Sequence, residues 1–380
     1  MKVVADDKIP YLKGVLEPFA DVVYLPGDRI TKDDLKDAEA LITRTRTKCT
    51  REILEGSSVK FIATATIGYD HIDTDWCEQN GIFWTNAPGC NSGSVYQYIA
   101  SILVNLAYKH KFNFADRSLG VIGVGNVGKK IVRLGEWLGM RVLLNDPPRS
   151  RNEGFCGFIS LDGIIRECDV ITCHVPLITE GPDKTYHLID ENLLRKLNPT
   201  TLLINSSRGE VVDNNALKSI LNQNKIAGAV LDVWENEPDI NLELMNVLDI
   251  VTPHIAGYSA DGKANGTTMS VQSLSKFFNL PLCGWFAEDI PEPANNQFTI
   301  DCSTKTMQEI ISEAILTTFQ VMEDDVRIRL SPSTFEKQRG NYPLRREFHA
   351  FTITLVNSNS EAKKTLSGLG FKIMDVNDLA

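Results

Sequence analysis

Residues Gly123, Gly125 and Gly128 form a Gly-x-Gly-x-x-Gly pattern at the end of an apolar segment, 119–124, and at the start of a segment with helical periodicity, 128–138. Glycine-rich turns are common, so the pattern alone is weak evidence. Its placement is more restrictive, because a strand that turns through glycines into a helix is the first βα unit of a doubly wound sheet. The chain is therefore expected to contain a parallel α/β sheet with a ligand-binding turn at this point.

Short apolar segments alternate with helical ones in two series. The strands expected in the first series are 3–5, 21–25, 40–42 and 61–63, separated by segments such as 31–38 and followed by a long helix, 92–109. The strands expected in the second series are 119–124, 141–145, 170–174, 201–205, 227–232 and 249–252, with helices that include 128–138 and 191–197. This rhythm predicts an α/β fold with two parallel sheets, the second a six-stranded Rossmann-type sheet.

The pattern changes near the C-terminal end. Pro291 and Pro293 lie among acidic and polar residues in 283–296, which is typical of a linker. After it, the periodicity predicts a helix over 306–324, an alternating strand over 348–356, a helix over 360–369 and a strand over 371–374. These elements predict a third, small α+β domain.

The charge balance excludes some functions. The formal net charge is −10, whereas broad contact with nucleic acid or an anionic membrane surface requires a large basic patch. No apolar run approaches the roughly 18 residues of a membrane span, and Asp6, Asp7 and Lys8 interrupt any signal-peptide core. We therefore expect a cytoplasmic protein without nucleic-acid or membrane partners.

The eight cysteines are scattered and include no CxxC pair. Neither a zinc site nor a disulfide framework is expected. Cys173 and His174 are adjacent on an expected strand, so their side chains would point to opposite faces and could not share a metal ion.

Asp146 ends the strand that follows the glycine turn. A carboxylate at this position hydrogen-bonds the ribose hydroxyls of a dinucleotide and repels the additional phosphate of NADP. Arg149 lies close enough in sequence to offset part of that repulsion. The glycines and Asp146 together predict NAD as the cofactor, with its pyrophosphate at the helix N-terminus.

Three residues that follow strands of the second series have the chemistry of a dehydrogenase. Arg208, Glu237 and His254 each come shortly after an expected strand, and such residues line the ligand crevice of a doubly wound sheet. His254 is the candidate base for a hydroxyl proton, and the Glu237 carboxylate would orient it and favour its charged form. Arg208 would bind a substrate carboxylate through two hydrogen bonds.

Several motifs, in this order, resemble the D-isomer-specific 2-hydroxyacid dehydrogenase family across about residues 1–285. They lie at 65–73, in the glycine turn, and at 173–177, 205–209, 231–238 and 252–254. The resemblance places the family's catalytic residues on Arg208, Glu237 and His254. The further cofactor contacts it implies are Asn126, Val127, Asp146, Val175, Ser206, Ser207, Arg208, Asp232 and Gly257.

The resemblance also implies how the domains are arranged. Residues 1–92 and 258–285 would form a discontinuous, flavodoxin-like substrate domain, into which the NAD-binding domain, 93–257, is inserted. Residues 286–380 would form a C-terminal domain that joins two copies of the chain as a homodimer. A βαβ effector-binding module over 352–374 is the alternative for this last domain.

A small cationic patch is compatible with a phosphorylated 2-hydroxy acid as the substrate. Arg44 and Arg46 are two residues apart after an early strand and would share a face. A solvated strand end is the alternative interpretation of these arginines. Further substrate contacts are expected from Thr45, Thr66, Gly68 and Tyr258, in addition to Arg208 and His254.

Two other functions remain open at this point. A related dehydrogenase that acts on glycerate, 3-phosphoglycerate or glyoxylate would share all of the motifs. A protein that binds NAD as a sensor, without turnover, could retain the same fold. An intact set of Arg208, Glu237 and His254 favours an enzyme over the sensor.

Overall fold

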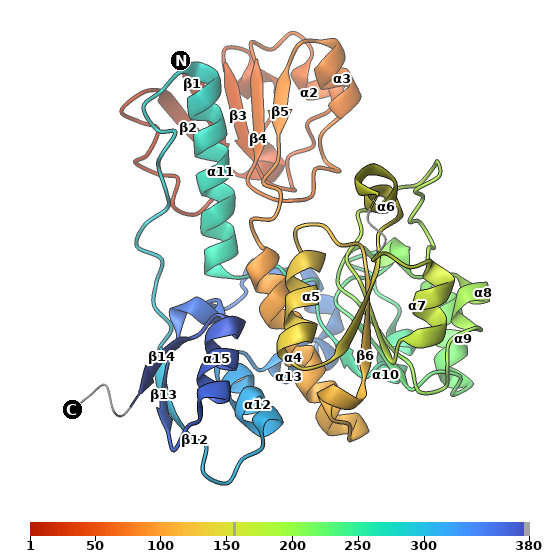
Figure 1. Ribbon diagram of the computed structural model, residues 1–380. Helices are drawn as coiled ribbons and strands as arrows, with labels where there is room; N and C mark the ends of the chain where they lie inside the picture. Colours follow the sequence, from red (N-terminus) through yellow and green to blue (C-terminus); the bar gives the residue numbers. More distant parts are fainter. Residues whose placement is uncertain (155–156, 376–380) are drawn as a thin grey trace. The chain divides into compact units, whose positions relative to one another are not determined.

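The computed structural model describes residues 1–154 and 157–375. The chain divides into two compact units (Figure 1). One contains Met1–Ser92 and Tyr258–Pro291, and the other contains Gly93–Gly257 together with the segment from Glu292 onward. The chain passes between the units after Ser92 and after Gly257, and again after Pro291.

The first unit is built on a five-stranded parallel sheet with the order β2-β1-β3-β4-β5. Its strands are β1 (Lys2–Asp6), β2 (Asp21–Leu25), β3 (Ala40–Thr43), β4 (Phe61–Thr64) and β5 (Phe83–Thr85). Its helices are α1 (Lys32–Leu35), α2 (Arg51–Leu54), α3 (Thr74–Gln79) and α11 (Ala260–Phe278). The strand order reverses between β1 and β3, which is where flavodoxin-like sheets bind ligands at their carboxyl edge.

Helix α11 returns to this unit from far along the chain and covers one face of the sheet. Its Val271 and Leu274 are buried in the same core as Phe61 and Ala63 of β4. A Cβ on Gly266 would lie 2.4 Å from the carbonyl oxygen of Ala65, so only glycine lets the helix approach the strand end this closely. This packing makes the unit discontinuous in sequence.

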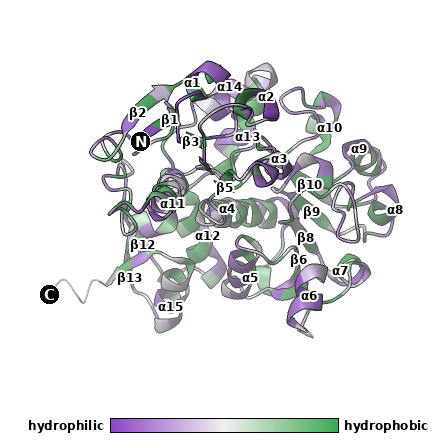
Figure 2. Ribbon diagram, turned by 90° about the horizontal axis from the view of Figure 1, so that it is seen from above, coloured by the Kyte–Doolittle hydropathy of each residue, from purple (hydrophilic) through white to green (hydrophobic). Residues whose placement is uncertain are grey.

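The second unit contains a six-stranded parallel sheet with the order β11-β10-β9-β8-β6-β7. Its strands are β6 (Ser118–Ile122), β7 (Arg141–Asn145), β8 (Val170–Cys173), β9 (Leu202–Asn205), β10 (Gly228–Leu231) and β11 (Ile250–Val251). Central strands buried on both faces have continuous apolar sequences, and Figure 2 shows β8, β9 and β10 as hydrophobic. The predicted Rossmann-type sheet is confirmed.

Helices cover both faces of this sheet. They are α4 (Ser92–His110), α5 (Gly128–Trp137), α6 (Pro147–Glu153), α7 (Leu161–Glu167), α8 (Glu191–Leu194), α9 (Asn214–Asn222) and α10 (Leu242–Val247). Side-chain oxygens cap several of their N-termini, as Asp213 does for α9 and Asn241 for α10.

The segment after Glu292 forms a third, three-stranded sheet that is also parallel, with the order β12-β13-β14. Its strands are β12 (Gln297–Asp301), β13 (Thr352–Val356) and β14 (Lys372–Asp375). Its helices are α12 (Met307–Thr318), α13 (Val321–Leu330), α14 (Phe335–Gly340) and α15 (Ser360–Leu369).

The prediction of one helix over 306–324 was wrong, because the chain is extended at Phe319 and Gln320 between α12 and α13. The carbonyl of Phe319 accepts from the hydroxyl of Ser101, which in turn accepts from the N–H of Val321. The Phe319 ring packs 6.4 Å from that of Tyr98. These contacts with α4 outweigh the local helical periodicity.

Strand boundaries also differ from the prediction in the third sheet. Residues Phe348–Ala350 form a 3-10 turn and the strand starts only at Thr352, because Phe348 turns to pack 4.5 Å from the ring of Phe371. Strands β5 and β12 were not predicted. Strand β5 has only three residues, and β12 follows directly on the proline-containing linker.

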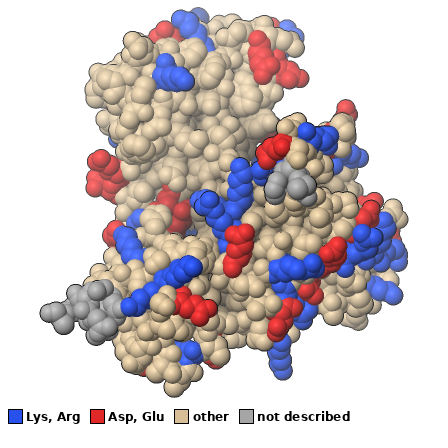
Figure 3. Space-filling view, viewed as in Figure 1, with Lys and Arg blue, Asp and Glu red and all other residues tan. Residues whose placement is uncertain are grey.

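Charged side chains of both signs lie on the surface of the protein (Figure 3). On the face shown in Figure 3, basic and acidic side chains of the second unit lie close to one another rather than in one large field of a single sign. None of the helices within 1–154 and 157–375 is long and apolar enough to cross a membrane.

Candidate active site

His254 and Glu237 form a hydrogen-bonded pair at the carboxyl edge of the second sheet. The imidazole Nδ1 lies 2.7 Å from Oε2 of Glu237. Burial opposes ionisation of Glu237, but the hydrogen bond and charge of His254 outweigh it, so the pKa of this carboxyl lies below its ordinary value. An ionised carboxylate can only accept, so Nδ1 carries the proton in the neutral imidazole and Nε2 is the basic atom.

The loop that carries His254 is fixed by the end of the neighbouring strand. Both oxygens of the buried Asp232 accept from this loop, from the N–H of Ile255 at 2.7 Å and from the N–H of Ala256 at 2.9 Å. The Thr252 hydroxyl also donates to Asp232, at 2.6 Å. His254 itself has a φ of 56°, which a non-glycine residue keeps only when its surroundings enforce it.

Trp234 links the same two loops and was not predicted from the sequence. Its indole N–H donates to the carbonyl of Thr252 at 3.0 Å, and its backbone N–H donates to Glu237 at 2.9 Å. The side chain is 2% exposed. Nothing in the local sequence distinguishes a Trp that only fills the core from one that also fixes the loop of a candidate catalytic residue.

Arg208 follows β9, next to the strand that precedes Glu237. Its loop is shaped by Asn205, whose amide donates to the carbonyl of Arg208 and accepts from both the N–H and hydroxyl of Ser207. A Cβ on Gly209 would lie 2.0 Å from the backbone of Trp234, so the two loops touch. The structure therefore joins the loops of all three predicted catalytic residues, with a direct hydrogen bond between Glu237 and His254.

The glycine turn has the geometry that a dinucleotide pyrophosphate requires. Gly123 has a φ of 85°, and a Cβ on Gly128 would lie 2.0 Å from the Gly123 carbonyl, so the start of α5 packs against the turn. In contrast, a Cβ on Gly125 would point into open space. No hydrogen bond within the described part of the chain uses the N–H groups of Gly125, Asn126 or Val127, which leaves them for phosphate oxygens.

Asp146 lies beside this turn and accepts from the N–H of Val124 at 2.8 Å. It also caps α6, where it accepts from the N–H of Arg149 at 3.0 Å. The Arg149 guanidinium is held by two hydrogen bonds of 2.7 Å to Glu153. The Arg149 side chain is thus paired with Glu153, while Asp146 keeps its carboxylate beside the glycine turn, as NAD binding requires.

Ser206 provides a second indication of a bound group. Its hydroxyl oxygen is buried and has no hydrogen-bond partner in the structure, and a buried unsatisfied hydroxyl is costly. Val175 also approaches the turn, since its methyl would lie 2.7 Å from a Cβ on Gly123. Gly257, at the end of the His254 loop, is half-buried. These features fit the cofactor residues expected from the sequence.

The predicted phosphate-binding arginines follow β3 in the first unit. Arg44 is half-buried and donates to the carbonyl of Lys8 at 3.2 Å. Thr45 and Arg46 are exposed. The loop is anchored behind them by the buried Thr47, whose hydroxyl donates to the carbonyl of Gly27 at 2.8 Å.

Thr66 and Gly68 follow β4, the strand next to β3. The Thr66 hydroxyl donates to the Gly68 carbonyl at 3.0 Å, so its proton is already used within the loop. The N–H of Gly68 donates to no acceptor among the residues that the structure describes. Tyr258 lies elsewhere in the first unit, with the Lys263 ammonium 5.1 Å from the centre of its ring.

Two other histidines near strand ends are unsuited to proton transfer near neutral pH. Burial lowers the pKa of His71 to about 4 and that of His174 to about 3, so both stay neutral. His174 is also bound to the Thr172 hydroxyl at 2.9 Å. Among the strand-end histidines, His254 alone has a carboxylate on one ring nitrogen within the described ranges.

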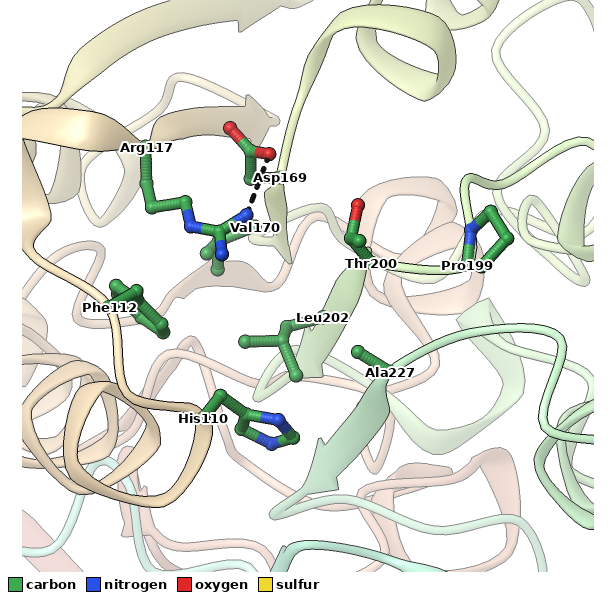
Figure 4. Close-up of a pocket in the computed structure, with 9 residues that line it drawn as sticks. All are labelled: His110, Phe112, Arg117, Asp169, Val170, Pro199, Thr200, Leu202 and Ala227. Atoms are coloured by element: carbon green, nitrogen blue, oxygen red, sulfur yellow. Dashed lines mark hydrogen bonds and ion pairs between the residues drawn. The ribbon is translucent and has the colours of Figure 1, made fainter.

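A pocket of about 170 Å³ lies at the opposite, amino edge of the second sheet (Figure 4). Its lining includes residues that precede β8, β9 and β10, whereas the candidate catalytic residues follow β9, β10 and β11. Arg117 and Asp169 pair with each other at 3.1 Å on one side of the pocket (Figure 4), and His110 pairs with Asp249. Its charged groups are thus already satisfied, and it is separate from the candidate site.

Possible metal ligands and thiols are dispersed within 1–154 and 157–375. No group of three or more His, Cys, Asp or Glu side chains there is arranged to hold a metal ion. The cysteines in these ranges are free thiols, most of them buried; Cys156 lies outside the described residues.

Comparisons with known proteins agree with this geometry. Residues 104–256 match the NAD-binding domain of the D-isomer specific 2-hydroxyacid dehydrogenases, and residues 290–370 match a domain of unknown function. In fold, the chain is similar to a D-lactate dehydrogenase from Aquifex aeolicus solved with NAD and lactic acid. The TM-score is 0.62 and the identity 28%, over 73% of this chain and 96% of that one.

Similarity to curated proteins extends over nearly the whole chain. An erythronate-4-phosphate dehydrogenase from Bacteroides thetaiotaomicron is 51% identical over 93% of this chain and 99% of its own length. One from Porphyromonas gingivalis is 43% identical over 98% of this chain and 100% of its own. The chain is an NAD-dependent oxidoreductase that acts on a CH–OH group. It belongs to the same family as these erythronate-4-phosphate dehydrogenases, within the D-isomer-specific 2-hydroxyacid dehydrogenases.

Proposed function

We propose that the chain is a cytoplasmic enzyme that oxidises 4-phospho-D-erythronate to (R)-3-hydroxy-2-oxo-4-phosphooxybutanoate on the route to pyridoxal 5'-phosphate. The names of the relatives that match nearly the full chain support this substrate. The observation that carries the chemistry is the 2.7 Å hydrogen bond between His254 and Glu237.

His254 acts as the base in this reaction. Its Nε2 takes the proton of the C2 hydroxyl while Nδ1 keeps its own proton and donates it to Glu237. The imidazolium that results lies next to a carboxylate that is already ionised, so the charge is stabilised where it develops. In the reverse direction the same Nε2 returns the proton to the carbonyl oxygen.

Arg208 binds the substrate carboxylate and polarises the oxygen at C2. Bound NAD supplies the acceptor for the hydride that leaves C2. The turn at Gly125 and the carboxylate of Asp146 hold the pyrophosphate and ribose, and the Ser206 hydroxyl gains a partner from the same ligand. The residues of the second unit thus suffice for proton removal and for binding of carboxylate and cofactor.

The phosphate of the substrate is assigned to Arg44 and Arg46. Parallel strands end at one edge of a sheet, so the loops after β3 and β4 present these guanidiniums near the unused N–H of Gly68. Thr45 is exposed beside them and has a hydroxyl to contribute, whereas the Thr66 proton is engaged. Tyr258 is assigned as a further substrate contact.

The substrate is tested by NADH absorbance with purified protein, NAD and a panel of acids. The panel contains 4-phospho-D-erythronate, D-erythronate, 3-phosphoglycerate, glycerate and lactate, with the corresponding oxo acids and NADH for the reverse direction. A kcat/KM that is highest for 4-phospho-D-erythronate supports the proposal. A higher value for another acid would retain the mechanism and replace the substrate.

A protein that senses NAD without turnover is the candidate from a different class. It would bind NADH, which is measured by fluorescence, but show no absorbance change with any acid of the panel in either direction. The paired His254 and Glu237 argue against it, because NAD binding alone needs neither residue.

We also propose that the chain forms a homodimer through its C-terminal domain. Large apolar side chains are exposed there, with 81% of Leu330, 52% of Val326 and 52% of Leu344 accessible. Val326 and Leu330 are four residues apart on α13 and share a face, and apolar residues exposed together in this way are typical of a protein interface. Light scattering of the wild type should give twice the mass of one chain, and Leu330→Lys should shift it toward a monomer. An unchanged mass would exclude this surface.

A further inference from the structure

Arg345, in the C-terminal segment, is buried against the loop that carries His254. Its side chain is 5% exposed, and its guanidinium donates to the carbonyls of Ile255 at 3.2 Å and Ala256 at 2.8 Å. It also donates to the carbonyl of Ser94 and, at 3.1 Å, to the amide oxygen of Gln97, both in α4. A buried guanidinium is costly unless it is hydrogen-bonded, and four hydrogen bonds of Arg345 go to the loop and to α4.

The two residues that follow Arg345 also contact the first turns of α4. The amide of Gln97 donates to the carbonyl of Arg346 at 2.9 Å, and the hydroxyl of Ser94 donates to Glu347 at 3.0 Å. A Cβ on Gly93 would lie 1.9 Å from the Glu347 carboxylate, so the chain approaches Glu347 closely there. The segment 345–347 therefore contacts α4 at the point where the second unit begins, after Ser92.

Ile255 and Ala256 are hydrogen-bonded through both their N–H groups and their carbonyls. The N–H groups of Ile255 and Ala256 donate to Asp232, and their carbonyls accept from Arg345. These two peptide units directly follow His254. One guanidinium thus ties the catalytic loop to the first turns of α4, and both segments lie next to points where the chain leaves the second unit.

The C-terminal segment also holds the chain before His254. The N–H of Val251 donates to the buried Asp325 of α13 at 2.7 Å. Asp325 is fixed by Arg329, which in turn donates to the carbonyls of Met245 and Leu248. His254 is therefore flanked by two contacts with the C-terminal segment.

We propose that Arg345 is a positioning residue for His254, so that the C-terminal domain is part of the machinery for hydride transfer as well as a candidate dimer interface. The expected change in kcat rests on the proposed function, whereas the expected change in hydrogen exchange of the loop does not. A lysine cannot replace Arg345, because its single nitrogen cannot also make the hydrogen bonds that Nε and Nη1 donate to Gln97 and Ile255.

The test compares wild type, Arg345→Lys and Arg345→Gln with the control Arg327→Lys. Arg327 is on α13 and pairs with Asp324 at 2.8 Å. Hydrogen exchange of the 250–257 peptide is measured without substrate. Both Arg345 variants should exchange faster there than wild type and control, and light scattering should give the same mass for all four proteins.

Kinetics supply the functional readout. The kcat of Arg345→Lys should fall by about tenfold or more at saturating substrate, because small misplacements of a catalytic group have effects of this size or larger. Its affinity for NADH, measured by fluorescence, should change less than about twofold, since the fall in kcat comes from the proton step. Wild-type exchange and wild-type kcat in Arg345→Lys would overturn the proposal, as would a loss of kcat explained by weaker NADH binding or by dissociation.

The substrate assignment is separated from this result. If the wild type prefers another acid of the panel, kcat is measured with that acid, and the proposed substrate fails while Arg345 is still tested. If no acid is oxidised, faster hydrogen exchange of the 250–257 peptide in the Arg345 variants would still support the claim that Arg345 holds this loop. Equal exchange in all four proteins would refute it.

Discussion

Two loops at the carboxyl edges of parallel sheets differ sharply in how they are held. The loop after β11 carries His254 and is fixed by Asp232, Trp234 and Arg345 through side-chain bonds to its backbone. The loop after β3 carries Arg44, Thr45 and Arg46, of which the last two are exposed. Both loops follow fully buried strands.

The difference matches the two tasks that we assign to the loops. Proton transfer requires a base within hydrogen-bond distance of a defined atom, so its loop must be rigid. Binding of a phosphate relies on charge and on several equivalent oxygens, which tolerates mobile side chains. Changes in the first loop should therefore lower kcat, and changes in the second should raise KM.

The largest effect is expected from His254→Ala. Loss of the base should lower kcat by about a thousandfold in both directions, within the usual range for general acid–base catalysis. His110→Ala, at the amino edge of the same sheet, is the control and should retain kcat within about twofold. Retention of most of the activity in His254→Ala would remove this residue from the mechanism.

Glu237→Gln should have the next largest effect. It should lower kcat by about a hundredfold, because a hydrogen bond to a charged group is worth up to about 3 kcal/mol. Glu235 is the matched control, since it pairs with His187 at 2.6 Å from the same loop. Equal losses in Glu235→Gln and Glu237→Gln would show a structural effect of the loop instead of orientation of His254.

Arg46→Ala tests the second loop. The KM for 4-phospho-D-erythronate should rise about tenfold, as expected for loss of a charge-assisted contact, with kcat nearly unchanged. The KM for unphosphorylated D-erythronate should not change. Arg51→Ala is the control, because Arg51 is exposed in the same unit and pairs with Glu55 at 2.8 Å. An equal rise for both acids would exclude a role in phosphate binding.

The smallest effect is expected from Asp146→Asn, which keeps an acceptor for the cap of α6 but removes the charge. The preference for NAD over NADP should fall about fivefold, since charges about 4 Å apart in water interact by about 1 kcal/mol. Asp162→Asn, exposed and paired with Lys196, is the control. An unchanged preference would mean that the shape of the pocket, rather than Asp146, selects the cofactor.

The sequence was sufficient for most strands of the two larger sheets and for the positions of the candidate catalytic residues, because these depend on local patterns. A few consecutive residues are enough to recognise an apolar strand or the glycine turn. The same is true of residues that follow a strand, such as Glu237 and His254. The pairing of Glu237 with His254 follows from neighbouring strands that end at one edge. Arg44 and Arg46 were found from charge and spacing, the other first-unit residues were added as further donors, and contacts of all of them with a phosphate remain a prediction.

What the sequence did not reveal depends on partners far along the chain. The break between α12 and α13 arises from Ser101, which is more than two hundred residues earlier. Arg345 lies in a segment without any motif, and its acceptors are in α4 and in the catalytic loop. A buried arginine and an exposed one cannot be told apart by periodicity when their hydrogen-bond partners are unknown.

The account is tested most directly by the pH dependence of wild-type oxidation from about pH 6 to about pH 9. Glu237 stays ionised over this range, because its pKa lies below its ordinary value, so its carboxylate can orient the base at every pH tested. The rate of NADH formation should rise toward mildly alkaline pH, because a base that takes the hydroxyl proton must be unprotonated. A flat wild-type profile would contradict His254 as the base.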